Sequence, residues 1–385
     1  MARVLIAFDK FKDALTARQA CEAAARGIRE IHPDWTLDLC PLTDGGEGFG
    51  ETLTHAAGGR LAEEPCSDPL GRVHRASIGY LNSNQLAPPI RARLQLAPNT
   101  VLAVVEMAAA SGLGLLAPLE RDPWHTSSRG TGELIAAAAR AGASAILLGV
   151  GGSATNDLGL GALAALGMRF LDVQGEVVDH LVPASWERIV RLEGRTKLPP
   201  LFIACDVTNP LLGPSGATAT FGPQKGLRNQ DGPRLERQMA RLAAMLTTAC
   251  AQPPGLADAP GAGAAGGIAF GLMVAAKAEL VPGFDLVSTW LNLPARLAAA
   301  DLVLTGEGRF DTTSLRGKGP GSLVMAARRL GKPTHVFAGR LDLAPDAPDL
   351  NGASAHVITP SELPLSVALS HAAELLQTAV TRNLD

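Results

Sequence analysis

The residues of this 385-residue chain that are best suited to chemistry lie in the run Gly149–Asp157, which reads GVGGSATND. It follows the apolar run 145–148, and this pattern predicts a strand that feeds a tight loop and then a helix. Glycines let the backbone approach a ligand closely, and a helix N-terminus offers unpaired N–H groups to an anion. Asn156 and Asp157 add oxygen atoms of the hard type that suits Mg²⁺. The run therefore predicts a nucleotide phosphate site.

Acidic residues recur where predicted strands end, at Asp9, Asp44, Asp157, Asp206 and Glu307. Ligands of open α/β sheets collect at the carboxyl ends of the strands, where carboxylates can hold Mg²⁺ or accept a proton from a hydroxyl group. Basic residues occupy predicted loops, at Lys10, Lys12, Arg129, Lys225, Arg309 and Lys318. Carboxylates, cations and glycine-rich turns are what phosphoryl transfer needs, because the protein mainly positions the reactants and neutralises phosphate charge.

These signals also have structural alternatives. Asp44 stands three residues before Glu47, which is the spacing of a helix N-cap. Lys10 and Lys12 belong to a residue type that is more often solvated than catalytic. The phosphoryl-transfer interpretation therefore depends on the coincidence of several signals.

The glycine run also fits a second function. Gly149, Gly151 and Ala154 match the G-x-G-x-x-G/A fingerprint of dinucleotide-binding proteins, and Asp172 follows about 20 residues on. Taken alone, this match predicts an NAD-dependent oxidoreductase that acts on a small hydroxy acid. A Walker A loop is absent, because no Gly-Lys pair in the chain is followed by Ser or Thr. A kinase with this sequence is therefore not a P-loop kinase.

The elements that must position these residues alternate between strands and helices at both ends of the chain. Predicted strands cover residues 4–8, 36–40, 145–150, 168–171, 201–205, 302–305, 334–338 and 357–359. Predicted helices cover residues 17–31, 49–57, 131–141, 158–166, 321–330 and 367–378. Alternation of this kind favours an α/β fold with a parallel sheet. We expect one domain from residues 1–60 plus 290–385 and an inserted second α/β domain from residues 61–289.

Composition limits the class of partner. Lys plus Arg number 34 and Asp plus Glu number 37, so the net charge is −3, and no run of basic residues offers a site for nucleic acid or an anionic membrane. The five cysteines form no C-x-x-C pair, which argues for a reducing compartment. The apolar run before Asp9 is too short for a signal peptide, and the uncharged stretch 259–276 is too rich in Gly and Ala for a membrane span. These features predict a cytoplasmic protein that acts on small molecules.

Nine segments, in order, resemble the bacterial glycerate kinases of the first type. They are FDKFKDAL (8–15), TDGGEG (43–48), EMAAASGL (106–113), TSSRGTGELI (126–135), GVGGSATND (149–157), ACDVTNPLLG (204–213), FGPQKG (221–226), PGAGAAGG (260–267) and TGEGRFD (305–311). The resemblance implies ATP-dependent phosphorylation of D-glycerate, usually at the 2-hydroxyl, with Mg²⁺. It also implies a flavodoxin-like parallel-sheet domain interrupted by a second α/β domain, with the active site in the cleft between the two.

Three segments depart from the family pattern. Phe8, Lys10 and Asp13 stand where the family usually has Pro, Ser and Gly, so a loop hydroxyl is replaced by a cation. The stretch 177–183 lacks the family's glycine triplet, and the usual GKVP is GKGP at 317–320.

The motifs and the resemblance together give a hypothesis for each site residue. Nucleotide phosphates would bind Gly149, Gly151, Gly152, Ser153, Thr155, Gly306, Gly308 and Arg309. Mg²⁺ would bind Asp157, Asp206 and Glu307. Asp44 or Asp9 would accept the hydroxyl proton, with Asp206 and Lys318 as further catalytic residues. Substrate would bind Lys12, Arg129, Asn156 and Lys225, the last as a further candidate to neutralise the γ-phosphate.

Two other classes of function remain open at the level of the sequence. An NAD-dependent oxidoreductase would bind nicotinamide cofactors and transfer hydride to hydroxypyruvate or a related acid. A non-catalytic sugar-acid sensor on a kinase fold would bind ligand without turnover. The oligomeric state, monomer or homodimer, is not indicated by the sequence.

Overall fold

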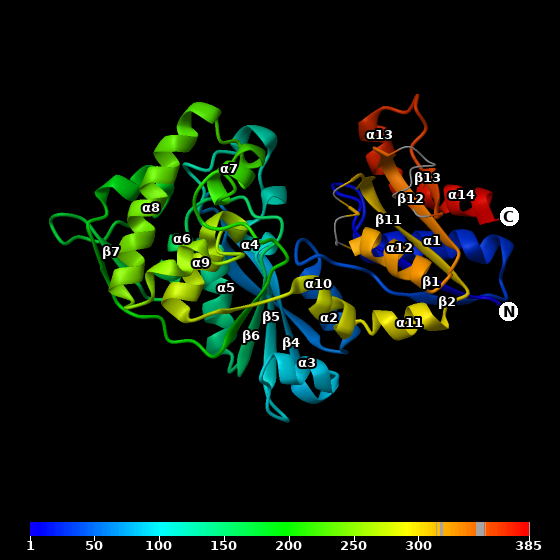
Figure 1. Cartoon of the computed structure of the whole chain (residues 1–385), viewed down its shortest axis with the longest axis horizontal. Helices are drawn as coiled ribbons and strands as arrows, with labels where there is room; N and C mark the ends of the chain where they lie inside the picture. Colours follow the sequence, from blue (N-terminus) through cyan, green and yellow to red (C-terminus); the bar gives the residue numbers. More distant parts are fainter. Residues whose placement is uncertain (313, 316–318, 344–349, 351, 385) are drawn as a thin grey trace. The chain divides into compact units, whose positions relative to one another are not determined.

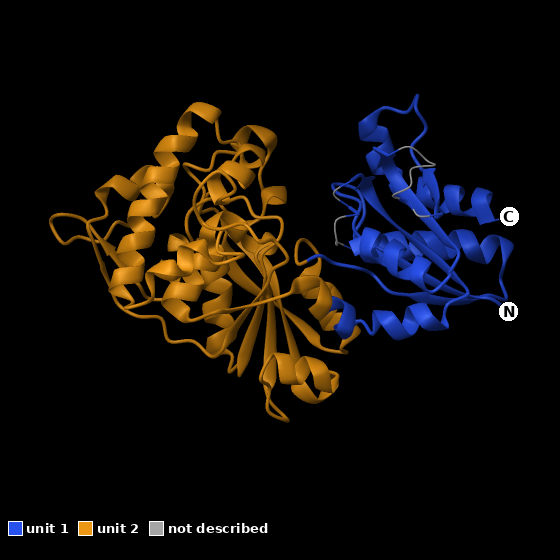
Figure 2. Ribbon diagram, viewed as in Figure 1, with its two compact units in different colours: residues 1–44, 287–385 blue, residues 45–286 orange. Residues whose placement is uncertain are grey.

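The computed structural model describes residues 1–385 except 313, 316–318, 344–349, 351 and 385. The described chain divides into two compact units (Figure 2). Unit 1 comprises residues 1–44 and 287–385, and unit 2 comprises residues 45–286. Each unit contains its own sheet and its own buried core, and each is described by itself below.

Unit 1 is built on a five-stranded sheet in the order β2-β1-β11-β12-β13, in which every pairing is parallel (Figure 1). Its strands are β1 (Arg3–Phe8), β2 (Thr36–Leu39), β11 (Leu302–Phe310), β12 (Thr334–Leu341) and β13 (Ser354–Val357). Numbered along the unit, this order is 2-1-3-4-5, which is the order of flavodoxin-like sheets. The predicted flavodoxin-like fold is confirmed.

Helices cover both faces of the sheet of unit 1. They are α1 (Ala17–Ile31), α11 (Leu293–Ala299), α12 (Gly319–Arg329), α13 (Leu365–Ser370) and α14 (Ala372–Leu384). The side chain of Thr16 accepts a hydrogen bond from the N–H of Gln19, and the side chain of Gln19 accepts one from the N–H of Thr16, so a capping box begins α1. Buried residues of α1 and α14 share one core with alternate residues of β1, and Val324 of α12 packs in a second core with Val336.

Unit 2 contains a six-stranded mixed sheet in the order β10-β9-β6-β5-β4-β3. Its strands are β3 (Arg60–Ser67), β4 (Val73–Asn82), β5 (Val101–Glu106), β6 (Ala145–Gly149), β9 (Leu201–Ala204) and β10 (Glu279–Val281). The strands β5, β6, β9 and β10 run parallel, and the hairpin β3–β4 is joined antiparallel to β5. The loops after β5, β6 and β9 therefore leave the same edge of the sheet, which is the edge where ligands bind in open α/β sheets.

The helices of unit 2 are α2 (Phe49–Ala56), α3 (Pro88–Arg93), α4 (Ala108–Ser111), α5 (Arg129–Arg140), α6 (Leu160–Ala165), α7 (Ala217–Phe221), α8 (Gly232–Ala249) and α9 (Ala264–Ala276). A helix α10 (Gly283–Trp290) carries the chain from unit 2 back to unit 1. The strands β7 (Arg169–Leu171) and β8 (Arg191–Glu193) form a separate antiparallel pair. Within the described part of the chain, no helix has the length and apolar character needed to cross a membrane.

The elements differ from the sequence-based expectation in several places, and the strands β5 and β10 and the helix α8 were among those not expected. β11 continues to Phe310, five residues beyond its predicted end, because 306–310 stay paired with β12. The hairpin β3–β4 was not expected, since its exposed, charged residues hide the apolar alternation on the inner face. The expected boundary at residue 60 differs from the observed one, because α2 packs on β4 and β5 and so belongs to unit 2.

Candidate active site

The glycine run begins at the last residue of β6 and turns against a neighbouring loop of unit 2. A Cβ atom on Gly151 would lie 2.7 Å from the backbone N of Gly46, and one on Gly149 would lie 2.7 Å from the carbonyl oxygen of Gly45. The backbone N–H of Gly151 donates a hydrogen bond to that same carbonyl at 2.9 Å. The two loops thus touch backbone to backbone, and this contact is possible only where side chains are absent.

The loop that contacts the glycine run, 45–48, is held by Glu106 at the end of β5. Its carboxylate accepts hydrogen bonds from the backbone N–H groups of Gly48 (3.1 Å) and Gly50 (3.0 Å) at the start of α2. The alternative interpretation of Asp44 as the N-cap of this helix is wrong, because the N-cap is Gly48 and it has no side-chain cap. The motif EMAAASGL pointed to Glu106, but its sequence did not reveal this role.

Asp157 holds the far end of the glycine run. Its carboxylate is fully buried and accepts four hydrogen bonds, from the N–H (2.7 Å) and hydroxyl (2.7 Å) of Ser128 and from the N–H groups of Gly159 (3.1 Å) and Gly161 (3.3 Å). Burial raises the pKa of this carboxyl, and those hydrogen bonds oppose the shift. The group therefore ties the starts of α5 and α6 together.

The buried side chain of Lys225 contacts the glycine run. Its side chain is 1% exposed, and its Nζ donates hydrogen bonds to the Ser153 hydroxyl (2.9 Å) and to the Thr155 carbonyl (2.6 Å). Burial lowers the pKa of Lys225 to about 7, and the charge of Asp157 opposes this shift. In this structure the lysine contacts the loop itself. Its burial and these contacts argue against the predicted direct contact with substrate.

Asn156 is likewise fully buried, and its amide donates a hydrogen bond to the Thr218 hydroxyl at 3.1 Å. The carbonyl oxygen of its side chain is buried without a partner among the described atoms. The start of α9 presses on the same segment, since a Cβ on Gly266 would lie 2.1 Å from the Thr155 carbonyl. The glycine-rich start of α9 therefore supports the glycine run.

The acidic residues of unit 1 lie at the carboxyl ends of its central strands. Asp9 follows β1 and is 6% exposed, and its Oδ1 accepts a hydrogen bond from the backbone N–H of Lys10 at 2.7 Å. The Lys10 ammonium lies 4.0 Å from Oδ1 of Asp9 and 3.6 Å from Oδ1 of Asp44. The cation that replaces the family's usual serine thus lies between two of the predicted catalytic carboxylates.

Glu307 adds a third carboxyl group to this part of unit 1. Burial raises its pKa to about 7, and the nearby charges of Asp9, Asp44 and Asp311 add to the rise, whereas a hydrogen bond with Ser314 opposes it. A group that gains and loses a proton near neutral pH, beside other carboxylates, is typical of a functional site. Crowding of this kind raises the energy of the cluster, and a bound cation would lower it.

The segment Gly306–Arg309 was expected to form a phosphate-binding loop, but it lies within β11. Gly306 and Arg309 are paired with β12, and the N–H of Gly308 points to the Lys10 carbonyl at 3.4 Å. The Arg309 side chain forms ion pairs with Asp342 (2.6 Å) and Asp311 (3.5 Å). Their backbone groups therefore serve the sheet, which argues against the predicted role in binding nucleotide phosphates.

The remaining predicted residues are dispersed. Both oxygens of Asp206 accept hydrogen bonds from the N–H of Phe284, at 3.1 and 2.9 Å, near the start of α10. Arg129 is exposed and bonded to Glu133 one helical turn on, at 2.9 Å, and Lys12 is exposed. Lys318 lies outside the described residues. Among the residues that the structure does describe, no three His, Cys, Asp or Glu side chains are grouped to hold a metal ion.

Two observations argue against the dinucleotide alternative. Asp172 should follow the strand next to β6 in one sheet, but it follows β7, which belongs to the separate β7–β8 pair. Its Oδ1 caps a turn by accepting hydrogen bonds from the N–H groups of Gln174 and Glu176, both at 3.0 Å. Asp172, the acid that would bind a ribose, therefore stabilises a turn outside the six-stranded sheet.

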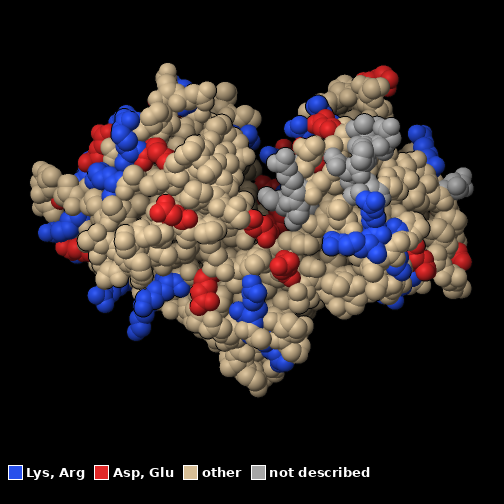
Figure 3. All heavy atoms as spheres, in the orientation of Figure 1, with Lys and Arg blue, Asp and Glu red and all other residues tan. Residues whose placement is uncertain are grey.

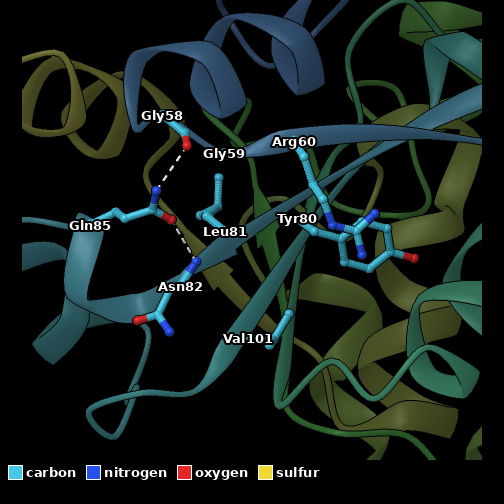
Figure 4. Close-up of a pocket in the computed structure, with 8 residues that line it drawn as sticks. All are labelled: Gly58, Gly59, Arg60, Tyr80, Leu81, Asn82, Gln85 and Val101. Atoms are coloured by element: carbon cyan, nitrogen blue, oxygen red, sulfur yellow. Dashed lines mark hydrogen bonds between the residues drawn. The ribbon is translucent and has the colours of Figure 1, made fainter.

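A surface pocket of about 340 Å³ lies at the opposite edge of the sheet of unit 2 (Figure 4). It is lined by Val101, the first residue of β5, whereas the glycine run adjoins the last residues of β5 and β6. The Arg60 guanidinium lies over the Tyr80 ring, 4.8 Å from its centroid, and Gln85 donates a hydrogen bond to the Gly58 carbonyl. These groups satisfy one another, and the pocket contains none of the predicted site residues.

On the face drawn in Figure 3, acidic and basic side chains are interspersed over both units.

The fold and these two clusters define an α/β protein with a flavodoxin-like domain, a second domain that carries a buttressed glycine-rich loop, and an acidic cluster at the carboxyl ends of parallel strands. Comparison with known proteins gives the family. The model of the glycerate kinase family matches residues 4–384, so the chain belongs to this family, and it is a kinase.

Individual relatives agree with this assignment. The glycerate kinase of Bacillus subtilis (strain 168) is 38% identical over 380 residues, which cover 97% of this chain and 95% of the relative. The glycerate 2-kinase of Escherichia coli (strain K12) is 38% identical over 343 residues, covering 88% and 85%. A crystal structure from Salmonella typhimurium LT2, whose name also refers to glycerate kinase 2, has a TM-score of 0.75 at 36% identity and covers 99% of this chain and 96% of its own.

Proposed function

We propose that this protein transfers the γ-phosphoryl group of ATP to the 2-hydroxyl of D-glycerate, giving 2-phosphoglycerate and ADP. Membership of the glycerate kinase family supports the acceptor, and a kinase of this family takes ATP as its co-substrate. The position of transfer is supported by the name of the Escherichia coli relative, glycerate 2-kinase. The nine motifs quoted above span most of the chain, so the support does not depend on one segment.

The observation that carries the proposal is the glycine run itself. Its first residues leave a parallel strand at the edge where ligands bind, and their shape is fixed by backbone contact with the loop 45–48. A loop of this kind can present N–H groups and the Ser153 hydroxyl to phosphate oxygens without reorganisation. We therefore assign Gly152 and Ser153 to the nucleotide phosphates, whereas Gly149, which is paired within the sheet, and Gly151, whose N–H is bonded to Gly45, give the loop its shape.

The acidic cluster of unit 1 is assigned to the acceptor hydroxyl. Asp44 is the better placed proton acceptor, because 34% of its side chain is exposed, whereas only 9% of the Asp9 side chain is. The Lys10 ammonium places a positive charge 4.0 Å from Asp9 and 3.6 Å from Asp44. The exposed cations Lys12 and Arg129 are proposed to bind the glycerate carboxylate.

The three residues predicted to bind Mg²⁺ fit that role unequally. Asp157 does not fit, because its carboxylate is buried and already accepts four hydrogen bonds. Glu307 fits better, because its carboxyl group is acted on by the negative charges of Asp9, Asp44 and Asp311, which a hard cation would offset. Mg²⁺ bound there would supply positive charge to phosphate oxygens. Asp206, whose oxygens accept the hydrogen bond from the N–H of Phe284, remains a proposed ligand.

The test is to incubate the purified protein with ATP, Mg²⁺ and D-glycerate and to follow the mixture by ³¹P NMR. A new phosphomonoester signal coupled to a single carbon-bound proton is expected, since C2 of glycerate carries one proton and C3 carries two. A signal coupled to two protons would move the site of transfer to the 3-hydroxyl. Absence of any signal from folded protein that binds glycerate would favour the sensor and overturn the proposal.

A further inference from the structure

Lys225 and Ser153 form an unusual pair in unit 2. The lysine side chain is 1% exposed, the serine is 8% exposed, and the two side chains are joined by a hydrogen bond of 2.9 Å from Nζ to Oγ. A second hydrogen bond of 2.6 Å runs from the same Nζ to the Thr155 carbonyl. The lysine thus reaches two points of the glycine run from the buried side, and the serine is the member of the pair nearer to solvent.

A buried lysine is costly to maintain. An ammonium group loses its hydration on burial and normally needs a carboxylate partner within the protein. The Lys225 ammonium instead donates to a hydroxyl and a carbonyl, and the buried Asp157 acts on it through its charge. Burial lowers the pKa of Lys225 accordingly. A methionine would fill similar space without this cost, so stability alone does not explain a lysine here.

The backbone that carries Lys225 is itself fixed. Its N–H donates to the Gly222 carbonyl at 3.0 Å, and the next residue, Gly226, has φ +94°, where a Cβ would lie 2.0 Å from the Arg121 carbonyl. The same segment holds the loop at a second point, because Thr218 of α7 accepts the hydrogen bond from Asn156. The segment 217–226 is therefore a platform that supports the glycine run.

We propose that Lys225 is a positioning residue, which acts on the nucleotide only through Ser153 and the loop and never touches a phosphate itself. The ammonium donates to the Ser153 oxygen, so the serine accepts on its inner side and keeps its own proton for an outward hydrogen bond. The bond to the Thr155 carbonyl fixes the end of the loop at the same time. The inference rests on the proposed function only in taking a nucleoside phosphate as the ligand of this loop.

The first experiment compares Lys225→Met with Lys197→Met, which removes an exposed lysine of the same unit. ADP binding is measured by isothermal titration calorimetry, and KM and kcat are measured for ATP and for glycerate. We expect Lys225→Met to melt within a few degrees of the wild type, to bind ADP about 10–100-fold more weakly and to keep the wild-type KM for glycerate. Lys197→Met should match the wild type in every respect. Unchanged ADP affinity in folded Lys225→Met would overturn the proposal.

A double-mutant cycle with Ser153→Ala tests the route of action. If Lys225 acts through Ser153, the double variant should bind ADP about as weakly as Lys225→Met alone, because the serine has lost its support already. Losses that multiply would show that the lysine reaches the ligand independently, and that outcome would contradict the proposal. Should Lys225→Met fail to fold, Ser153→Ala and Lys225→Gln, which keeps a donor, carry the same comparison.

The failure of this inference is distinguishable from the failure of the proposed function. Turnover of glycerate by the wild type tests the function, whereas the ADP affinities of the Lys225 and Ser153 variants need no turnover. Wild-type protein that does not phosphorylate glycerate but binds ADP would leave the calorimetric comparison fully informative. Wild-type protein that does not bind ADP at all would remove the ligand on which the inference rests and would overturn it.

Discussion

The two clusters of predicted site residues are built on opposite physical principles. In unit 2 the glycine run is buttressed by hydrogen bonds from Lys225, by the carboxylate of Asp157 and by backbone contact with the loop 45–48. In unit 1 the carboxyl groups of Asp9, Asp44 and Glu307 crowd one another, and the pKa of Glu307 is raised to about 7. Under the proposed function, this difference predicts that the glycine run binds its ligand through a shape fixed by the fold, and that the carboxyl groups of unit 1 act through their charge.

If this contrast is correct, loss of charge in unit 1 should affect rate far more than stability. Asp44→Asn is expected to lower kcat by about 10²–10⁴-fold, since a positioned general base contributes that much. The melting temperature should stay near that of the wild type, because the side chain is partly exposed. The matched control is Asp34→Asn, which changes an exposed aspartate of the same unit. Wild-type kcat in Asp44→Asn would assign the proton to another group.

In unit 2 the opposite result is expected from a carboxylate of similar chemistry. Asp157→Asn should lower the free energy of unfolding by about 2–4 kcal/mol, because an amide NH₂ would face donors that now bond to a carboxylate. Urea unfolding measures this loss, with exposed Asp179→Asn as control. A variant that keeps its stability and loses only Mg²⁺-dependent activity would restore the metal-ligand hypothesis for Asp157.

The sequence predicted some features of these two clusters and missed others, and the reason is whether a feature depends on a short segment or on tertiary contacts. Three features were predictable: the parallel sheet of unit 1, the capping box at Thr16, and the tight loop that the glycine run forms after β6. Each depends on apolar periodicity or local turn chemistry, which are properties of short segments. The roles of Asp157 and Lys225 were not, since four hydrogen bonds to one carboxylate come from residues 128, 159 and 161, and Lys225 meets a loop 70 residues away. Which groups are buried is a property of the tertiary structure.

The extension of β11 was missed for a related reason. Glycines at 306 and 308 are typical of a loop, yet a Cβ on Gly306 would lie 1.8 Å from the Phe337 carbonyl, so the glycine serves close strand packing. The same residue type therefore has different meanings in the two units. In the glycine run it allows two loops to touch, and in β11 it allows two strands to do so.

The shape of the glycine run can be altered without changing any charge. Gly151→Ala would place a Cβ 2.7 Å from the backbone of Gly46, where neither chain can move cheaply. We expect kcat/KM for ATP to fall by on the order of 10²-fold, because a displacement of about 1 Å in a positioning loop costs that much. Gly255→Ala, whose Cβ would meet nothing within 4 Å, is the control. Equal activity in both variants would show that backbone contact does not shape the site.

The smallest expected effect is a rise of stability with pH above neutrality that the buried Lys225 of unit 2 should produce. The pKa of Lys225 is lowered to about 7 in the folded protein from 10.5 in the unfolded chain, so above pH 7 the unfolded chain binds more protons at this site. Stability therefore rises with pH through this window, and over two units from pH 7 the rise from one such group is about 2 kcal/mol. Urea unfolding of the wild type and of Lys225→Met at pH 7 and 9 isolates this contribution, because the variant lacks the titrating group. A rise of equal size in the variant would mean that Lys225 is not the group that titrates, and that its ammonium is accommodated in unit 2 at less cost than its burial implies.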